Sequence, residues 1–266
     1  MYDFQKANMW KRISAALCDL ILLAIVTVGF IFLLASLLGI NGYVTRFAEL
    51  QTSYKEQYGI VTQERYNEIP EAERENYRVE KDYASLTEAE RAKYDEADKA
   101  FTQDEEANYV YGMIINRTLI MIIFGVLLAY TLLEFVVPLI FKNGQTLGKK
   151  IFGVALMRED GVKISPMLLF VRTILGKYTV ETMIPVMIIV MIIFGIMGVV
   201  GTVVVVAMLI AQIILVAATK ARTPLHDKLA HTVAVDYASQ MIFDSPEAMI
   251  AYKQKIHAEQ VEADRS

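Results

Sequence analysis

The chain has 266 residues, of which 55% are hydrophobic, with a mean hydropathy of +0.38 and a net charge of −4. Three blocks, 13–40, 113–141 and 183–219, contain almost no charged residues, and each is longer than the ~20 residues that a helix needs to cross a bilayer. This pattern excludes an ordinary soluble domain and predicts an integral membrane protein. The first block is too long for the apolar part of a signal peptide and lacks a small-x-small cleavage site, so we expect an uncleaved first span.

The charge is divided unevenly along the chain. Residues 43–111 contain 9 Lys and Arg against 17 Asp and Glu, and the rest of the chain has a net charge of +4. The basic residues that flank the apolar blocks are Lys6, Lys11 and Arg12; Lys142, Lys149 and Lys150; and Lys220, Arg222 and Lys228. Because Lys and Arg concentrate on the cytoplasmic side, this pattern predicts cytoplasmic termini and an extracytoplasmic acidic loop. An exposed acidic surface also argues against a nucleic-acid partner.

The third block is too long for one span. Its 37 residues would extend about 55 Å as a single helix, against a bilayer core of ~30 Å. We expect a turn near Gly198 and a helix that begins at Pro166 after the cap Ser165. The prediction is therefore four membrane helices at about 13–40, 113–141, 166–196 and 199–219. The alternative is three spans with an interfacial helix at 166–182.

The acidic loop between the first two spans is expected to form short, charged helices. Residues 69–77 and 86–94 form an internal repeat, and Ser85 with Glu88 fits the pattern of a capping box. Two interpretations remain open for this loop: a solvated extracytoplasmic cap, or a surface that binds a partner protein.

Two strand-like stretches flank the last helical pair. Residues 151–157 are followed by a turn signal at Glu159–Gly161, and residues 232–236 are rich in β-branched side chains. We expect these stretches to pair below the membrane. The fold class predicted is an all-α polytopic membrane protein: a four-helix transmembrane bundle with a small cytoplasmic β-hairpin element and a helical extracytoplasmic loop. Its expected divisions are 1–42, 43–112, 113–240 and a cytoplasmic C-terminal helix at 241–266.

The motifs "GQTLGKKIFGVAL" and "LHDKLAHTVAV", with an arginine and an aspartate in the first helix, resemble the RDD family of bacterial membrane proteins. The family is named for one arginine and two aspartates, which fall here on Arg12, Asp19 and Asp227. The resemblance covers roughly 7–40 and 113–237, and leaves out the acidic loop and the tail. It implies a multi-pass protein of the bacterial inner membrane, with transport as the suggested activity.

Polar residues inside the predicted spans form the candidate site. Measured from the inner ends of the helices, Asp19, Glu134, Arg172 and Gln212 fall in one layer, with one residue from each helix. Since an acid in hydrocarbon costs ~3 kcal/mol, Asp19 should face inward, and we expect Arg172 to hold both Asp19 and Glu134. Arg12 should lie at the inner edge, where it can reach headgroups.

Two hypotheses for the layer remain open. Either it is a binding site for a proton or small cation in a transporter or antiporter component, or it only locks the helices of a membrane scaffold or accessory subunit together. Candidate partners are the lipid bilayer, further copies of the chain or other membrane proteins, and a small cation or proton.

Other chemistries have weaker signals. Cys18 is expected to be a packed thiol, and His226, Asp227 and His231 match no strong metal-ligand spacing. Gly144 and Gly148 are four residues apart, so the spacing of a phosphate-binding loop is absent. We expect no enzyme activity, no metal and no cofactor.

Overall fold

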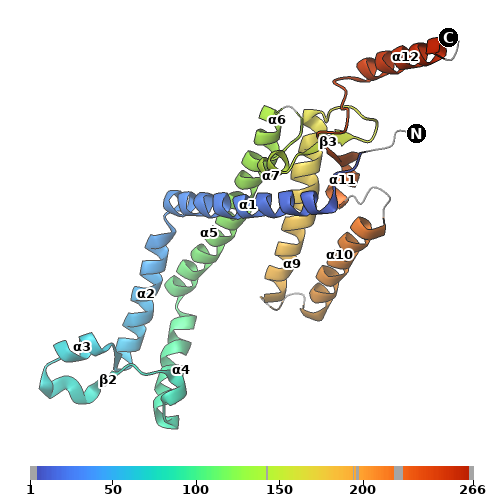
Figure 1. The fold of residues 1–266 in the computed structure, drawn as a ribbon. Coiled ribbons are helices and arrows are strands. Elements are labelled where there is room, and N and C mark those ends of the chain that lie inside the picture. Colours follow the sequence, from blue (N-terminus) through green and yellow to red (C-terminus); the bar gives the residue numbers. More distant parts are fainter. Residues whose placement is uncertain (1–4, 142, 194, 196–197, 219–223, 264–266) are drawn as a thin grey trace. The chain divides into compact units, whose positions relative to one another are not determined.

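A computed structural model describes residues 5–141, 143–193, 195, 198–218 and 224–263, and the chain is mostly helical (Figure 1). It divides into two compact units, one of residues 1–30 with 123–266 and one of residues 31–122. The boundaries lie within helices, so the first two apolar helices each contribute to both units.

Three described helices are long and apolar enough to cross a membrane. The first is α1, Met9–Leu38. The second, Glu105–Phe141, joins α5 (Glu105–Tyr130), η3 (Thr131–Val136) and α6 (Val137–Phe141). The third, Pro166–Ile193, joins α8 (Pro166–Phe170), η4 (Val171–Met183) and α9 (Ile184–Ile193). Its predicted start is confirmed, because the Ser165 hydroxyl accepts a hydrogen bond from the Leu168 N–H at 3.3 Å.

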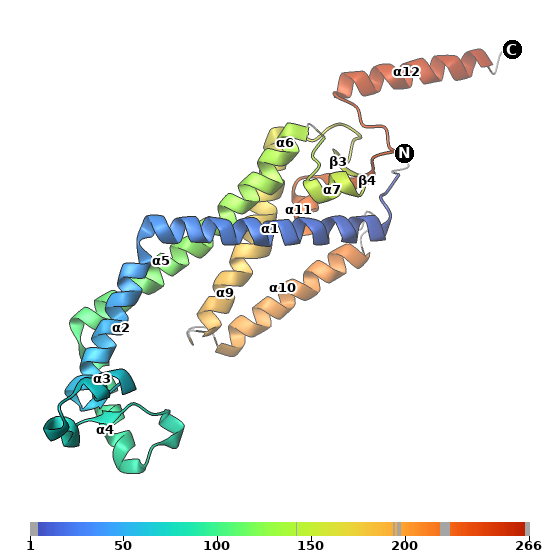
Figure 2. The ribbon, with the colours of Figure 1, turned by 60° about the vertical axis from the view of Figure 1, so that its left-hand side comes forward.

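A fourth apolar helix, α10 (Gly198–Ala218), packs beside α9 (Figures 1 and 2). The helix α9 ends at Ile193 and α10 begins at Gly198, the residue near which a turn was expected. Gly195 and Gly198 have φ angles of 70° and 46° there. Glycine adopts this left-handed backbone without strain, which explains why the chain can turn at this point.

The segments η3 and η4 are π-helices, in which each N–H reaches the carbonyl five residues back. The Val137 N–H binds the Leu132 carbonyl, and the Ile184 N–H binds the Thr179 carbonyl. Threonine hydroxyls in η4 follow the same spacing, as Thr182 Oγ1 donates to the Lys177 carbonyl at 2.9 Å. These segments lie inside the helices expected at about 113–141 and 166–196, and they interrupt the α-helical form. Helical π-segments occur frequently at functional sites.

The two predicted strands pair. The strands β3 (Val154–Arg158) and β4 (Thr232–Asp236) are antiparallel, with Leu156 opposite Ala234. They are separated by α8 to α11, so they form a two-stranded sheet rather than a hairpin. The first strand begins later than residue 151, because Ile151 ends the helix α7 (Leu147–Ile151) and Gly153 turns the chain with a φ of 65°.

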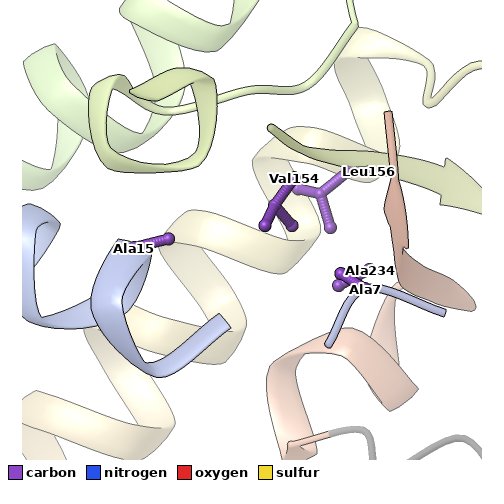
Figure 3. Close-up of a cluster of buried hydrophobic side chains, with 5 residues drawn as sticks. All are labelled: Ala7, Ala15, Val154, Leu156 and Ala234. Carbon is purple, nitrogen blue, oxygen red and sulfur yellow. The ribbon is translucent and has the colours of Figure 1, made fainter. Parts of the chain in front are cut away.

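Apolar side chains cover both faces of this sheet. On one face, Val154, Leu156 and Ala234 pack against Ala7 and Ala15 of the N-terminal segment and α1 (Figure 3). The other face is formed by Ala155, Met157, Val233 and Val235. The sheet thus anchors the start of α1 next to α7 and α11 (Leu225–Leu229). The last described element is α12, Pro246–Ala263.

The second unit contains the acidic loop. Its elements are α2 (Ile40–Gln57), β1 (Ile60–Val61), α3 (Gln63–Glu68), the 3₁₀ helix η1 (Glu71–Asn76), β2 (Arg78–Val79), the 3₁₀ helix η2 (Tyr83–Ser85) and α4 (Glu88–Gln103). The capping box is formed by Thr87 and Glu90, so the assignment to Ser85 and Glu88 was wrong. Charged short helices were correctly expected, but the two halves of the repeat differ in structure, one forming η1 and the other the start of α4.

Candidate functional site

The first unit contains a cavity of about 310 Å³ lined by charged side chains. Its walls come from α1, η3, η4, α7 and α11, all within this unit. The acids are Asp19, Glu134, Glu181 and Asp227, the cations are Arg12, Lys149, Arg172 and Lys177, and His226 lies among them. Polar groups are rarely placed at such density in membrane-spanning segments, and where they occur they pair with one another or line a pathway.

Arg172 is the central cation of the cluster. Arg172 is only 2% exposed, and its Nε donates a hydrogen bond to Asp227 Oδ1 at 2.6 Å. Its Nη1 lies 4.0 Å from Glu134 Oε2. The Thr232 hydroxyl also donates to Asp227 Oδ1, at 3.0 Å. Burial opposes ionisation of Asp227, but the adjacent Arg172 outweighs it and holds the pKa of Asp227 below its usual value.

Glu134 connects the second and third apolar helices. Lys177 Nζ donates to Glu134 Oε2 at 2.6 Å, and the Thr173 hydroxyl donates to the Glu134 carbonyl at 3.0 Å. Glu134 lies in η3, and the other two residues lie in η4. The two π-segments therefore face each other through a charged contact and a backbone contact.

Asp19 is held by the first turn of α7. Its carboxylate accepts a hydrogen bond from the Thr146 hydroxyl at 2.5 Å and from the Gly148 N–H at 2.7 Å, while Lys149 Nζ lies 3.9 Å away. Thr146 is also the N-cap of α7. A Cβ on Gly148 would collide with the Ala15 carbonyl and the Asp19 carboxylate, so only glycine allows this close approach.

His226 docks onto η4 through Glu181. The His226 N–H donates to Glu181 Oε1 at 2.9 Å, and its ring Nδ1 lies 2.8 Å from Glu181 Oε2. Gly176 makes room for α11, because a Cβ there would lie 2.7 Å from His226 Cβ. Burial, reinforced by Arg172, lowers the pKa of His226 despite its acidic neighbours.

Lys149 is mostly buried among charges of both signs. Burial, together with the nearby charges of Lys177 and Arg172, lowers the pKa of Lys149 to about 8. Its Nζ donates one long hydrogen bond, 3.3 Å, to the Thr146 hydroxyl.

The structure brings together Arg172, Glu134 and Asp227, and it places Arg12 and Asp19 in the wall of the same cavity. Two partners were predicted for Arg172. Glu134 lies 4.0 Å from its Nη1, but Asp19 is held by polar groups of α7, and Asp227 binds Nε instead. The Thr146 hydroxyl and the Gly148 N–H lie closer to Asp19 than Lys149 Nζ, which is 3.9 Å away. The side chain of Gln212, in α10, lies outside the described residues.

Sequence reasoning did not include Lys177, Glu181 or Thr146 in the candidate site, and it considered His226 only as a metal ligand. Lys177 follows Arg172 by five residues, which on an α-helix would rotate it about 140° away from the same face. In the π-helical η4, residues five apart align, so Arg172 and Lys177 both face Glu134. The signal that could have identified Thr146 is its position before a helix start, where threonine is a favoured cap.

The metal interpretation finds no support in the described part of the chain, which contains no group of three or more His, Cys, Asp or Glu that could hold an ion. His226 binds Glu181, whereas His231 has a largely exposed side chain that faces Glu159 at 3.8 Å.

Comparison with known proteins identifies the family of the chain. A model of the RDD family matches residues 6–231, which include Arg12, Asp19 and Asp227. Searches of curated proteins and of solved structures found no match. The family model covers most of the chain, from the segment before α1 to the residue before β4, and the resemblance noted in the motifs is thereby confirmed. The chain belongs to the RDD family of membrane proteins.

Proposed function

We propose that this RDD protein is a transport component that moves protons or small cations across the membrane through the charged cavity. The observation that carries the proposal is the presence of four acids in one cavity of the unit that contains most of the apolar helices. Each charge in a hydrocarbon layer costs roughly 2.5–3.5 kcal/mol on insertion scales, and a simple structural lock between helices gains much less.

Glu134 is the residue at which we propose that the proton or cation binds and is released. In the structure its carboxylate has one side-chain hydrogen-bond donor, the ammonium of Lys177. Asp227, by contrast, accepts from both Arg172 and Thr232, and Asp19 accepts from both Thr146 and Gly148. A proton or cation that binds Glu134 therefore displaces only Lys177, whose long stem allows it to move away.

The proposed arrangement in the membrane has four spans, α10 being the fourth, with both termini in the cytoplasm of a bacterial inner membrane. The basic residues at the ends of the apolar blocks support this orientation. Four helices provide little width for a complete alternating path, so we infer that the transporting form is a homo-oligomer.

The test is ion flux in proteoliposomes that contain the full chain. Glu134→Gln removes the charge but keeps the shape, and it should abolish pH-gradient-driven flux of Na⁺ or K⁺. Glu64→Gln, an exposed acid in the other unit, is the matched control and should leave flux unchanged. Equal flux from wild type and Glu134→Gln would contradict the proposed role of Glu134.

A second candidate function is a non-catalytic scaffold or accessory subunit. It is favoured by the fact that each acid in the cavity has a polar or charged partner. This hypothesis predicts no flux from wild type above that of empty liposomes, together with a loss of thermal stability in Glu134→Gln.

A further inference from the structure

The second unit contains a cavity of its own, of about 380 Å³, between α2 and α4. Its walls also include Ile60 of β1 and Tyr83 of η2. All of its lining residues fall between 51 and 101, so the cavity lies entirely within this unit. Its volume falls in the range of roughly 300–1,000 Å³ that is usual for small-molecule sites.

Aromatic rings form much of the wall of this cavity. They are Tyr54 of α2, Tyr83 of η2, and Tyr94 and Phe101 of α4. Phe101 is 7% exposed and packs against the Tyr54 ring, with the ring centres 5.8 Å apart. The Tyr54 hydroxyl donates to Asp104 Oδ2 at 2.9 Å, and the Tyr83 hydroxyl donates to Asp95 Oδ1 at 2.8 Å. These contacts hold the rings in place without any ligand.

Two carboxylates at the same cavity have no cation of the chain beside them. Asp95 and Asp98 are three residues apart on α4, so their side chains are neighbours on one face of the helix. Within the described part of the chain, neither forms an ion pair, and the Asp98 side chain has no hydrogen-bond partner. Lys55, which also lines the cavity, is already paired with Glu80 at 2.6 Å. The charge that is not neutralised at this cavity is therefore negative.

Rings and carboxylates together select an organic cation. The face of a tyrosine ring attracts cations, and cages of aromatic rings bind ammonium groups. The chain itself shows this attraction, since the Arg91 guanidinium lies 5.6 Å from the centre of the Tyr83 ring. A hard metal ion instead requires several oxygen ligands, and the described residues contain no group of three or more His, Cys, Asp or Glu that could hold one. An alkylammonium group uses both parts of the wall, because its methylene groups can cover the rings.

We propose that this cavity binds an alkylammonium group, with the ammonium at Asp95 and Asp98 and the aliphatic chain against the rings of Tyr54 and Tyr94. Such a group comes from a free aliphatic amine or from the lysine side chain of a peptide. Residues 43–111, with 17 Asp and Glu against 9 Lys and Arg, would attract either source. The site goes beyond the proposed ion transport and does not depend on it, because it lies in the other unit.

Isothermal titration calorimetry of the purified full chain in detergent tests the site. The probes are cadaverine, its neutral analogue pentanediol, and a capped Gly-Lys-Gly tripeptide. The titrations are made at about 150 mM salt, which screens general attraction to the acidic surface. We expect cadaverine to bind saturably, at least tenfold more tightly than pentanediol. Pentanediol that bound as tightly as cadaverine, or no binding of either cadaverine or the tripeptide, would overturn the proposal.

The tripeptide distinguishes the two sources of the group. Tighter binding of cadaverine than of the tripeptide would support the site and assign it to a free amine. Tighter binding of the tripeptide would support the same site and assign it to a lysine side chain.

Two acids of α4 provide a matched pair of variants. Asp98→Asn should weaken cadaverine binding on the order of tenfold, which corresponds to the loss of one charged contact. Glu96→Gln removes the same charge two residues away, but Glu96 does not line the cavity, so binding should not change. Both residues are exposed, so neither change should disturb folding. Equal weakening in both variants would indicate only general attraction to the acidic surface and would overturn the proposal.

Variants of Tyr94 separate its ring from its hydroxyl, which accepts a hydrogen bond from the Lys81 N–H at 2.9 Å. Tyr94→Phe keeps the ring and should retain cadaverine binding, whereas Tyr94→Leu removes the ring and should weaken binding about fivefold. Unchanged binding in Tyr94→Leu would overturn the role of the ring. If Tyr94→Leu does not fold, the comparison of cadaverine with pentanediol on wild type still tests the proposal. Binding is measured without an ion gradient, so its outcome is independent of whether the protein transports ions.

Discussion

Asp227 balances the buried charge of Arg172, so its loss should cost more than the loss of one contact. Asp227→Ala leaves the guanidinium buried beside Glu134 at 4.0 Å, with no direct acceptor for Nε. Breaking one side of a buried pair typically costs 3–5 kcal/mol. We expect a clear fall in the melting temperature in detergent.

The double variant separates pairing from packing. Adding Arg172→Leu to Asp227→Ala removes the unpaired charge and should recover part of the lost stability. Thermal melting of the two single variants and the double variant gives the coupling free energy. If the two effects simply added, Arg172 and Asp227 would not depend on each other.

A substitution of Gly148 would test the contact between α1 and α7. Gly148→Ala places a methyl group against the Ala15 carbonyl and the Asp19 carboxylate and should destabilise the protein by about 1–3 kcal/mol. Gly29→Ala, in α1 with nothing within 4 Å of the added Cβ, is the control, and it should be neutral or slightly stabilising. Equal melting temperatures for the two variants would show that α1 and α7 do not approach closely.

At the scale of elements, the register in which β3 and β4 pair can be tested by cross-linking. Leu156 and Ala234 are opposite each other and contribute to the same buried face (Figure 3). In a Cys18→Ala background, Leu156→Cys with Ala234→Cys should form a disulfide under mild oxidation. Leu156→Cys with Val235→Cys should not, because neighbouring residues of a strand point to opposite faces. Cross-linking of both pairs to the same extent would mean that the register is not fixed.

Regular patterns in the sequence predicted the elements well. Long apolar blocks identified α1 and the second apolar helix, and β-branched runs between turn signals identified β3 and β4. The π-helical form of η3 and η4 could not be predicted, because their composition is that of an α-helix and the extra residue per turn depends on tertiary contacts. This matters for the site, because Arg172 and Lys177 both face Glu134 in the π-helical η4.

The candidate site was predictable only in part for a related reason. The depth of Glu134 and Arg172 in their helices followed from their distance to the helix ends. The partner of Asp19 did not, because the polar groups that hold it belong to Thr146 and Gly148, outside any apolar block. Short helices such as α7 leave little periodic signal in a sequence.

At the scale of the whole molecule, the proposed four-span arrangement makes a topology prediction. In a Cys18→Ala background, Ser53→Cys in the acidic loop should react with an impermeant maleimide in intact cells. Ser245→Cys, just before α12, should react only after the membrane is permeabilised. Labelling of Ser245→Cys from outside would instead indicate an odd number of spans.

The separation of Arg172 from Asp227 along the chain has a consequence for biosynthesis. The two residues are 55 positions apart, and ribosomes add about 5–20 residues per second, so Arg172 is made roughly 3–11 s before its partner exists. Glu134 precedes both of them on the nascent chain. Glu134 has therefore already been synthesised during this interval, and in the finished fold it lies 4.0 Å from Arg172. We therefore expect Glu134 to act as the counter-ion of Arg172 while the third apolar helix is inserted, and Asp227 to join it once α11 has docked.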